Sequence, residues 1–429
     1  MRERNYRQCL KVGRRPPSPT CYQVTNPDTH AAAVMPPNAA PGPAGRRKLL
    51  FLVTEDWYFW SHRLPVARAA RTAGFEVVVA TRVQAHGERI RDEGFVLRAL
   101  AWRRCDALIG AYRAIWEIAR LYRAEQPDLV HHIALKSVLF GGIASRLAFI
   151  GSPDAPAVID AIMGFGSGFS HASFAARLRQ QMLGLCLLFT AHRRCRWVTV
   201  QNADDHAVLV GAGMDPDRVT VIRGSGVDLS HFLPLPDPGS PIVTVALVSR
   251  MLREKGVLDA VAAIRLLRQR GLAIELLLAG PTDPDNRGHL TVELMASLCE
   301  APGIAWLGPV ADVRTVWRRA AIAILPSTYG EGAPKALLEA AACARPIVAT
   351  DVPGCREVVR SGQTGILVPP RDIIRLAEAI AVLAGDAASR TRMGRAGRAM
   401  VEKDFSEQRV ARETLEIYQS ALRERAALG

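Results

Sequence analysis

Two glutamates and two basic residues stand where they could bind one charged ligand together. Glu331 and Glu339 enclose the segment EGAPKALLE, and Arg250 and Lys255 lie in SRMLREKG, earlier in the chain. An ideal helix would separate the two carboxylates by about 12 Å, which is too far for an acid–base pair. The spacing favours contacts with two parts of one extended ligand. Taken alone, these residues fit a purely structural interpretation equally well. Glu331 and Glu339 would then belong to a capped helix with a solvated glutamate, and Arg250 and Lys255 would be solvated loop cations.

Each of these segments follows a predicted buried strand and leads into a predicted helix. AIAILPS precedes the glutamate segment, PIVTVALVSR contains Arg250, and Pro334 suits the first position of a helix. In open α/β sheets, ligands bind beyond the carboxyl ends of strands, where helix N-termini offer free amides to anions. We expect such free amides at 333–336. A guanidinium and an ammonium at this place would hold a diphosphate.

The elements that must position these residues alternate between strand and helix along the chain. This alternation is typical of parallel sheets covered by helices on both faces. Four prolines in LPLPDPGSP (233–241) mark a linker between two such regions. The sequence therefore predicts an α/β fold with two Rossmann-like domains, over 47–235 and 236–405. A proline-rich disordered leader (1–46) precedes them, and an amphipathic helix (406–429) follows.

The composition of the chain argues against some classes of protein and favours others. The net charge is +14, but the first 48 residues hold nine Lys/Arg and two acids, so half of the excess lies there. A mildly basic remainder argues against a dedicated nucleic-acid-binding protein and suits an anionic substrate or membrane surface.

Eight scattered cysteines predict reduced thiols in a cytoplasmic protein. No apolar run reaches the ~20 residues of a membrane span. The segment 182–191, flanked by arginines, is a buried helix or one in the membrane interface.

The chemistry-bearing segments also resemble a known family. SRMLREKG, LLLAG, WLGPVADV, ILPSTYGEGAPKALLEAAACARPIVATDVPGCREVV and TGILVPP follow, in order, the donor half of retaining glycosyltransferases of family four. That family has the GT-B fold and an E-x7-E signature, and the likeness extends from about Lys48 to the C-terminus. It implies two domains facing each other across a cleft, with the last helix packing back on the first domain. It also implies hexosyl transfer from a nucleotide sugar, expected to be UDP-linked, with retained anomeric configuration.

The resemblance assigns roles to individual residues. Arg250 and Lys255 would stabilise the donor diphosphate as leaving group, Glu331 would face the sugar and pyrophosphate, and Glu339 would bind the ribose hydroxyls. No metal or other cofactor is expected, since we find no DxD-type acid pair in a suitable loop. The other candidates belong to the same loop and helix, or to the strand end expected beside the base. They are Gly332, Ala333, Pro334, Lys335, Leu338, Gly308, Val310 and Ser327.

The first half resembles the branch that builds bacterial surface polysaccharides (O-antigen, capsule or exopolysaccharide), often on undecaprenyl diphosphate. TEDWYFWSHR replaces the usual glycine-pair loop there, and its aromatic residues would stack on a sugar, meet lipid or staple the next helix. Ile133 takes the position of a family histidine, and adjacent His131 and His132 must point to opposite faces of their strand. GFGSGFS (164–170) is expected to be a mobile acceptor-side loop. Candidates for the acceptor or its phosphates are Trp57, Tyr58, Ser61, His62, Arg63, His131, Lys136 and Gly164.

Three alternatives remain beside the transferase: a sugar-nucleotide epimerase, a phosphorylase and a non-catalytic subunit of polysaccharide assembly. An epimerase needs no aromatic acceptor side, and we identify no cofactor lysine for a phosphorylase. The four intact charged residues count against a non-catalytic subunit. The expected partners are a nucleotide-sugar donor, a lipid-linked saccharide acceptor and the inner face of the cytoplasmic membrane, with peripheral attachment through the 177–194 region. No nucleic acid is expected.

Overall fold

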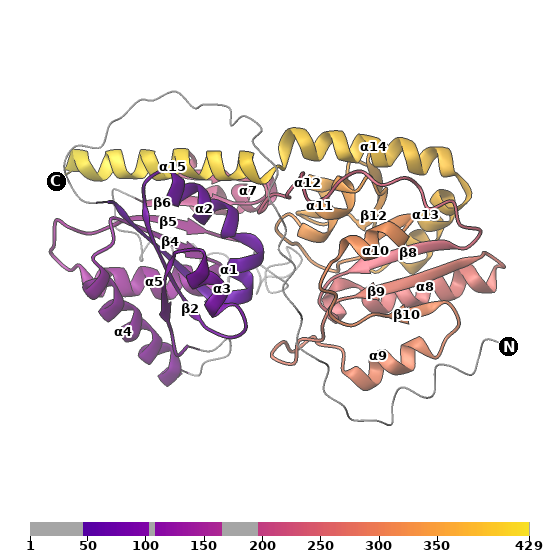
Figure 1. The fold of residues 1–429 in the computed structure, drawn as a ribbon, viewed down its shortest axis with the longest axis horizontal. Coiled ribbons are helices and arrows are strands. Elements are labelled where there is room, and N and C mark those ends of the chain that lie inside the picture. The colour runs from indigo at the N-terminus through magenta and orange to yellow at the C-terminus, as the bar shows by residue number, and fades with distance from the viewer. Residues whose placement is uncertain (1–45, 103–107, 165–195, 429) are drawn as a thin grey trace, which may run out of the picture. The chain divides into compact units, whose positions relative to one another are not determined.

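The computed structural model describes residues 46–102, 108–164 and 196–428 (Figure 1). These residues contain two sheets in which all neighbouring strands run parallel, one of seven strands and one of six. The predicted α/β fold with two Rossmann-like domains is confirmed. The leader, the GFGSGFS segment beyond Gly164 and the 177–194 region lie outside the described residues.

The first sheet has the order β3-β2-β1-β4-β5-β6-β7. Leu50 of β1 aligns with Val78 on one side and with Val130 on the other, so the strand order reverses at β1. Such reversals are where open α/β sheets bind ligands. The strands are β1 (Lys48–Glu55), β2 (Glu76–Arg82), β3 (Val96–Ala99), β4 (Leu129–Ile133), β5 (Ala157–Ala161), β6 (Arg196–Val200) and β7 (Val219–Val221).

The first helix of the first sheet begins earlier than the sequence predicted. A helix takes the place of the expected loop after β1, and its Phe59 is buried in the core beside Phe51. Pro65 occupies the first turn of the next helix, where a missing amide hydrogen is harmless. The helices are α1 (Asp56–His62), α2 (Leu64–Thr72), α3 (Gly87–Asp92), α4 (Leu108–Glu125), α5 (Leu135–Ala148) and α7 (Ala203–Gly211).

The second sheet repeats the same plan, with the order β10-β9-β8-β11-β12-β13 and the reversal at β8. Its strands are β8 (Val243–Val248), β9 (Ile274–Ala279), β10 (Ile304–Trp306), β11 (Ile322–Leu325), β12 (Ile347–Thr350) and β13 (Gly365–Val368). Its helices are α8 (Val257–Gln269), α9 (Val292–Cys299), α10 (Arg314–Arg319), α11 (Lys335–Ala342), α12 (Cys355–Val358), α13 (Ile373–Gly385) and α14 (Ala387–Asp404). The sequence did not predict α14.

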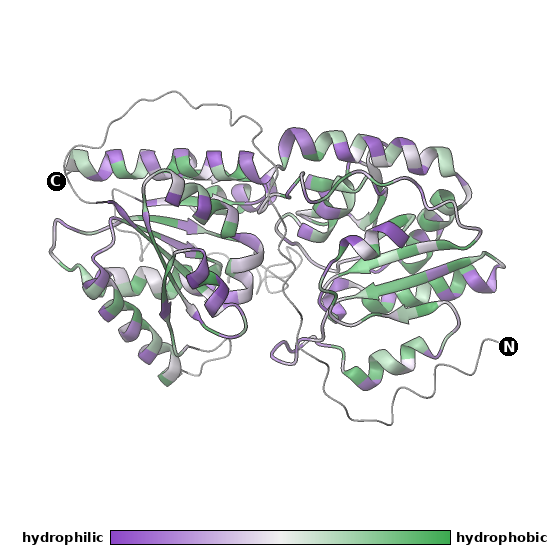
Figure 2. Ribbon diagram, viewed as in Figure 1, coloured by the Kyte–Doolittle hydropathy of each residue, from purple (hydrophilic) through white to green (hydrophobic). Residues whose placement is uncertain are grey.

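Strands of both sheets are largely hydrophobic (Figure 2), which matches burial on both faces. The final helix, α15 (Glu407–Leu428), packs beside α2 on the first sheet (Figure 1). Val410, Ile417, Tyr418 and Leu422 enter the core that contains Phe51. None of the helices in the described ranges is both long and apolar enough to cross a membrane.

Candidate active site

The loops after β8 and β11 lie side by side because these strands are neighbours in the second sheet. Arg250 and a 3-10 turn, Arg253–Lys255, follow β8, and the glutamate loop follows β11. Gly256 has φ +71°, and a Cβ there would lie 1.9 Å from the Pro326 carbonyl oxygen. The chain therefore needs glycine to bring Lys255 against the end of β11.

Lys255 and Glu331 form an ion pair, with Nζ 2.5 Å from Oε2. Ser327 Oγ donates to the other carboxylate oxygen of Glu331, and Thr350 Oγ1 donates to the Ser327 carbonyl oxygen at 2.5 Å. Both ion-pair side chains are mostly shielded from solvent. The fold thus joins the two segments that the sequence singled out, and Ser327 holds Glu331 in place.

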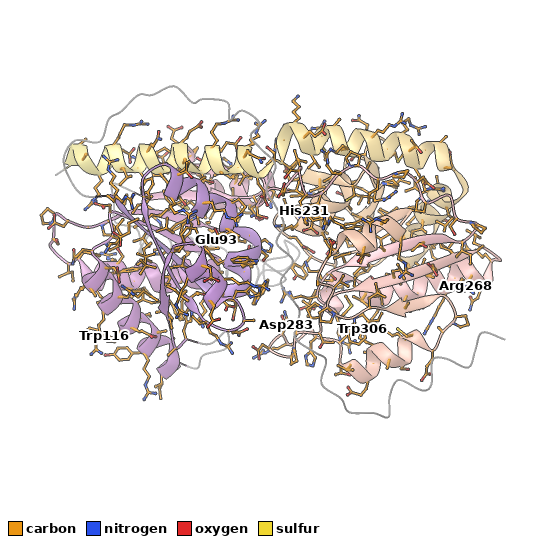
Figure 3. The ribbon with its side chains drawn as sticks, in the orientation of Figure 1. Glu93, Trp116, His231, Arg268, Asp283 and Trp306 are labelled. Carbon is orange, nitrogen blue, oxygen red and sulfur yellow. The ribbon has the colours of Figure 1, made fainter. Side chains whose placement is uncertain are left out.

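Arg250 lies beside an acid that the sequence interpretation did not consider. Its guanidinium pairs with Asp283, on the loop after β9 (Figure 3), and lies 6.0 Å from the ring centre of Trp57. Asp283 and Asp285 do have DxD spacing, a signal that the sequence analysis passed over. Asp285 lies 3.7 Å from Arg82, so each of these carboxylates has an arginine beside it.

Glu339 stands one turn inside α11, apart from the Lys255–Glu331 pair. Burial raises the pKa of its carboxyl to about 7; the Lys335 charge opposes this shift, and Glu407 adds to it. Lys335 Nζ lies 3.9 Å from the Glu407 carboxylate, at the start of α15. The two glutamates of the signature therefore occupy different surroundings, as their spacing predicted.

The glutamate loop is held by two residues that the sequence analysis missed. Gln201 Oε1 accepts from the Ala333 amide at 3.1 Å, and Asn202 Nδ2 donates to the Glu331 carbonyl oxygen at 3.2 Å. The expectation of a free amide at Ala333 is therefore wrong. Both residues directly follow β6, so the strand-end rule that found the other candidates could have found them. Gly164 touches the same loop, because a Cβ there would lie 3.0 Å from the Gly332 nitrogen.

The end of α1 also contacts α11. Lys335 Nζ donates to the Ser61 carbonyl oxygen at 2.5 Å, and Ser61 Oγ lies 2.6 Å from His62 Nδ1. The His62 ring stacks on Tyr58 with centres 4.2 Å apart. Burial, with the charges of Lys335 and Arg63, holds the pKa of His62 well below its ordinary value. The imidazole is therefore neutral near pH 7, where it can take part in hydrogen bonds but resists protonation.

Two family models match the chain. Residues 48–179 match the glycosyl transferase 4-like family and residues 242–386 match the glycosyl transferases group 1 family. The chain is a GT-B glycosyltransferase. It is 24% identical over 380 residues to the N,N'-diacetylbacillosaminyl-diphospho-undecaprenol α-1,3-N-acetylgalactosaminyltransferase of Campylobacter jejuni, with 84% of this chain and 95% of that protein covered.

Two further likenesses agree with this assignment. The glycosyltransferase is 34% identical over 257 residues to the α-maltose-1-phosphate synthase of Mycolicibacterium smegmatis, which covers 52% of this chain but only 65% of that relative. Its fold matches Anabaena HepE in complex with UDP and glucose, with a TM-score of 0.71 at 18% identity. That match covers 87% of this chain and all of the other chain.

The remaining acceptor-side candidates of the glycosyltransferase divide between two environments. Arg63 and His131 are buried and line a cavity with room for about one water molecule, beside Gln201. His131 Nδ1 lies 2.5 Å from the Tyr418 hydroxyl. Lys136 lies elsewhere, 5.5 Å from the ring centre of Trp102, so the fold does not bring it to the Lys255–Glu331 pair.

His132 points away from His131, as predicted for adjacent residues of a strand. Its Nδ1 lies 2.7 Å from Asp160 Oδ1 and its Nε2 lies 2.9 Å from the Tyr122 hydroxyl, all in the buried core. This histidine is a satisfied core residue. Asp160 also pairs with Arg196, so the charge of that carboxylate is balanced inside the sheet.

The other donor-side candidates of the glycosyltransferase surround the same strand ends. Pro334 caps α11 rather than starting it, and Leu338 is fully buried in the core of the second sheet. Gly308 accepts a hydrogen bond from the Gly280 amide at 2.8 Å, which ties the end of β10 to that of β9. Val310 packs against the same core as Leu338. Their contacts with a donor remain predictions.

Proposed function

We propose that this glycosyltransferase moves a hexose from a UDP-sugar to a saccharide carried on undecaprenyl diphosphate, for cell-surface polysaccharide. The observation that carries the proposal is the Lys255–Glu331 ion pair with Arg250 nearby, at the carboxyl ends of β8 and β11. Two cations at that position suit a diphosphate, and the adjacent carboxylate suits the hydroxyls of a sugar.

The relatives support the choice of substrates. The Campylobacter jejuni protein, similar over most of both chains, is named for an undecaprenol-linked acceptor. The structurally similar Anabaena protein was solved with UDP and glucose. Transfer with retention of the anomeric configuration is the outcome that the family resemblance implies.

The proposed chemistry is mainly electrostatic. The bond between the anomeric carbon and the diphosphate oxygen breaks, and its electron pair leaves with the nucleoside diphosphate. An acceptor hydroxyl forms the new bond to that carbon, and its proton passes to the departing diphosphate. Arg250 and Lys255 would neutralise the departing diphosphate, and stabilisation of this kind by preorganised charges is commonly the largest catalytic contribution. Glu331, fixed by Ser327, would orient the sugar.

We further propose that the reaction needs no metal, because the two cations supply positive charge at the leaving group. Activity should then survive thorough treatment with a chelator such as EDTA. Loss of activity that returns when Mg²⁺ or Mn²⁺ is added would contradict this point. In that case, Asp283 and Asp285 would be the first ligands to examine.

The protein is proposed to attach peripherally to the inner face of the cytoplasmic membrane, where an undecaprenyl-linked acceptor would lie. Cell fractionation tests this: the protein should sediment with membranes at low salt and be released by a high-salt wash, since peripheral electrostatic attachment weakens with ionic strength. Recovery entirely in the soluble fraction at low salt would contradict it.

The decisive experiment measures UDP release from a panel of UDP-sugars, with and without undecaprenyl-diphosphate saccharides. Lys255→Ala should abolish release while the circular dichroism spectrum is retained, and Lys403→Ala, an exposed lysine on α14, is the matched control. Unchanged turnover in Lys255→Ala would refute its diphosphate role. Interconversion of UDP-sugars without release would indicate an epimerase, and phosphate-dependent release a phosphorylase. Absence of UDP binding and of any turnover would indicate a non-catalytic subunit.

A further inference from the structure

The outer face of α4 carries large apolar side chains that nothing in the described structure covers. Ile109 is 71% exposed, Tyr112 63% and Trp116 36%. Trp116 lies on the side of α4 that faces away from the sheet (Figure 3), and its ring is 6.2 Å from that of Tyr112. Single exposed apolar residues are common, but a contiguous group on one helix face marks an interaction surface.

Two arginines lie on the same face. At 100° per residue, Arg113 and Arg120 fall within the same third of the helix circumference as the three apolar residues. Both are exposed, and neither has an acidic partner among the described residues. Together with Tyr112, Trp116 and Glu117, they line one shallow surface depression.

The other charged groups of this helix are engaged elsewhere. Glu117 accepts hydrogen bonds from the Ala101 amide at 3.1 and 3.3 Å. Arg123 donates to carbonyl oxygens at the end of α5, including that of Leu147 at 2.6 Å. The opposite side of α4 is buried, with Ile118 and Tyr122 in the core. The depression thus holds two arginines and one glutamate, so its net charge is positive, at +1.

We propose that this face of α4 docks onto the surface of a membrane that contains anionic lipids. Tyr and Trp favour the interface because one part of each ring system is apolar and another is polar, and arginines pair with lipid phosphates. A helix that lies in the interface combines an apolar stripe with basic residues in this way. The inference rests on the proposed function in one respect, that the acceptor is held in a membrane.

The observations favour a lipid surface over a protein partner or a second copy of this chain. A homodimer through this face would bring Arg113 and Arg120 of each copy close to the same arginines of the other, with only one Glu117 per copy to balance two arginines. A protein partner would have to be acidic and apolar in the same pattern, whereas an anionic bilayer supplies both properties everywhere.

The test is flotation of the full chain with vesicles of phosphatidylcholine, with or without phosphatidylglycerol. Wild-type protein should float with the anionic vesicles. The double variant Tyr112→Glu, Trp116→Glu should reduce the bound fraction at least about ten-fold, since two apolar anchors are lost. Arg113→Ala and Arg120→Ala should each weaken binding to anionic vesicles by about five-fold and leave binding to neutral ones unchanged.

Val382→Glu is the matched control, because Val382 is an exposed apolar residue on α13 of the second sheet. It should float like wild type. Wild-type protein that stays unbound, or a double variant that floats like wild type, would overturn the proposal. The proposal would also be overturned if sedimentation velocity showed that the wild-type protein is a dimer and the double variant a monomer.

UDP release from a UDP-sugar, measured without vesicles, separates this inference from the proposed function. The double variant should release UDP at the wild-type rate, because neither residue lies near Lys255. Vesicle binding without any UDP release would contradict the transferase function and leave the docking surface standing. UDP release without vesicle binding would contradict the docking surface and leave the transferase function standing.

Discussion

At the scale of single residues, the ammonium of Lys255 must exchange one partner for another when a diphosphate binds. It now pairs with Glu331. Glu331→Gln should therefore raise the affinity for free UDP about five- to ten-fold, because the diphosphate no longer competes with a carboxylate for that cation. Turnover should still fall about 10²-fold, since the sugar loses its charged contact.

Calorimetric titration with UDP and the rate of UDP release check these two effects separately. Glu402→Gln, an exposed glutamate on α14, should change neither value. Weaker UDP binding in Glu331→Gln would mean that Glu331 only orders the loop. The proposed competition for Lys255 would then be wrong.

Glu339 gives a second prediction at this scale, because its pKa of about 7 in the folded protein exceeds the ordinary ~4.3 of an unfolded chain. As pH rises between these values, the unfolded chain loses its proton first, so the folded state loses stability across that interval. Glu339→Gln should therefore add about 1–2 kcal/mol to the unfolding free energy near pH 8 and little near pH 4.5, after allowance for partial exposure. Urea unfolding at both pH values measures this, with exposed Glu416→Gln as control.

At the scale of elements, the end of β6 fixes the loop between β11 and α11 through Gln201. Gln201→Leu removes the acceptor of the Ala333 amide, whereas Gln201→Glu keeps an oxygen there. Hydrogen exchange of that amide should quicken about ten-fold or more in the leucine variant, since the loss of one buried hydrogen bond is worth roughly 1–3 kcal/mol. Amides of β12 should be unaffected. Equal exchange at Ala333 in both variants would contradict the predicted role of Gln201.

The same contact shows what the sequence could and could not predict. Apolar strands such as β1 and β8, and the charged groups that follow them, are local signals, so the fold and the Lys255–Glu331 neighbourhood could be predicted. Gln201 and Ala333 stand 132 positions apart in the chain, and no local pattern specifies their hydrogen bond.

Helix α14 escaped prediction for a different reason, which is its composition. It is mostly polar, and glycines lie on its buried side. A Cβ at Gly394 would lie 2.0 Å from the Ala344 carbonyl oxygen, so the helix packs closely there. Its buried apolar residues are few, namely Met393, Met400 and Val401, and this makes the stripe that sequence patterns detect weak.

At the scale of the whole molecule, the last helix completes the core of the first sheet although it follows the second sheet in the chain. Val410, Ile417, Tyr418 and Leu422 of α15 are buried there. Such side chains contribute roughly 1.5–3 kcal/mol each. Their sum is comparable to the ~5–15 kcal/mol of stability that a typical domain has in total.

A variant that ends at Ser406 should therefore unfold the first sheet and leave the second folded. Phe405 and Val401 are retained, and they belong to the core of the second sheet. Limited proteolysis should then preserve a fragment close to 229–406, which keeps Phe232 and Phe405 of that core, while most of residues 46–228 are degraded. A chain that ends at Arg425 keeps Val410, Ile417, Tyr418 and Leu422 and the ion pair with Asp128, so it should resist digestion like wild type. Equal resistance of both regions in the shorter variant would show that the first sheet is stable without α15.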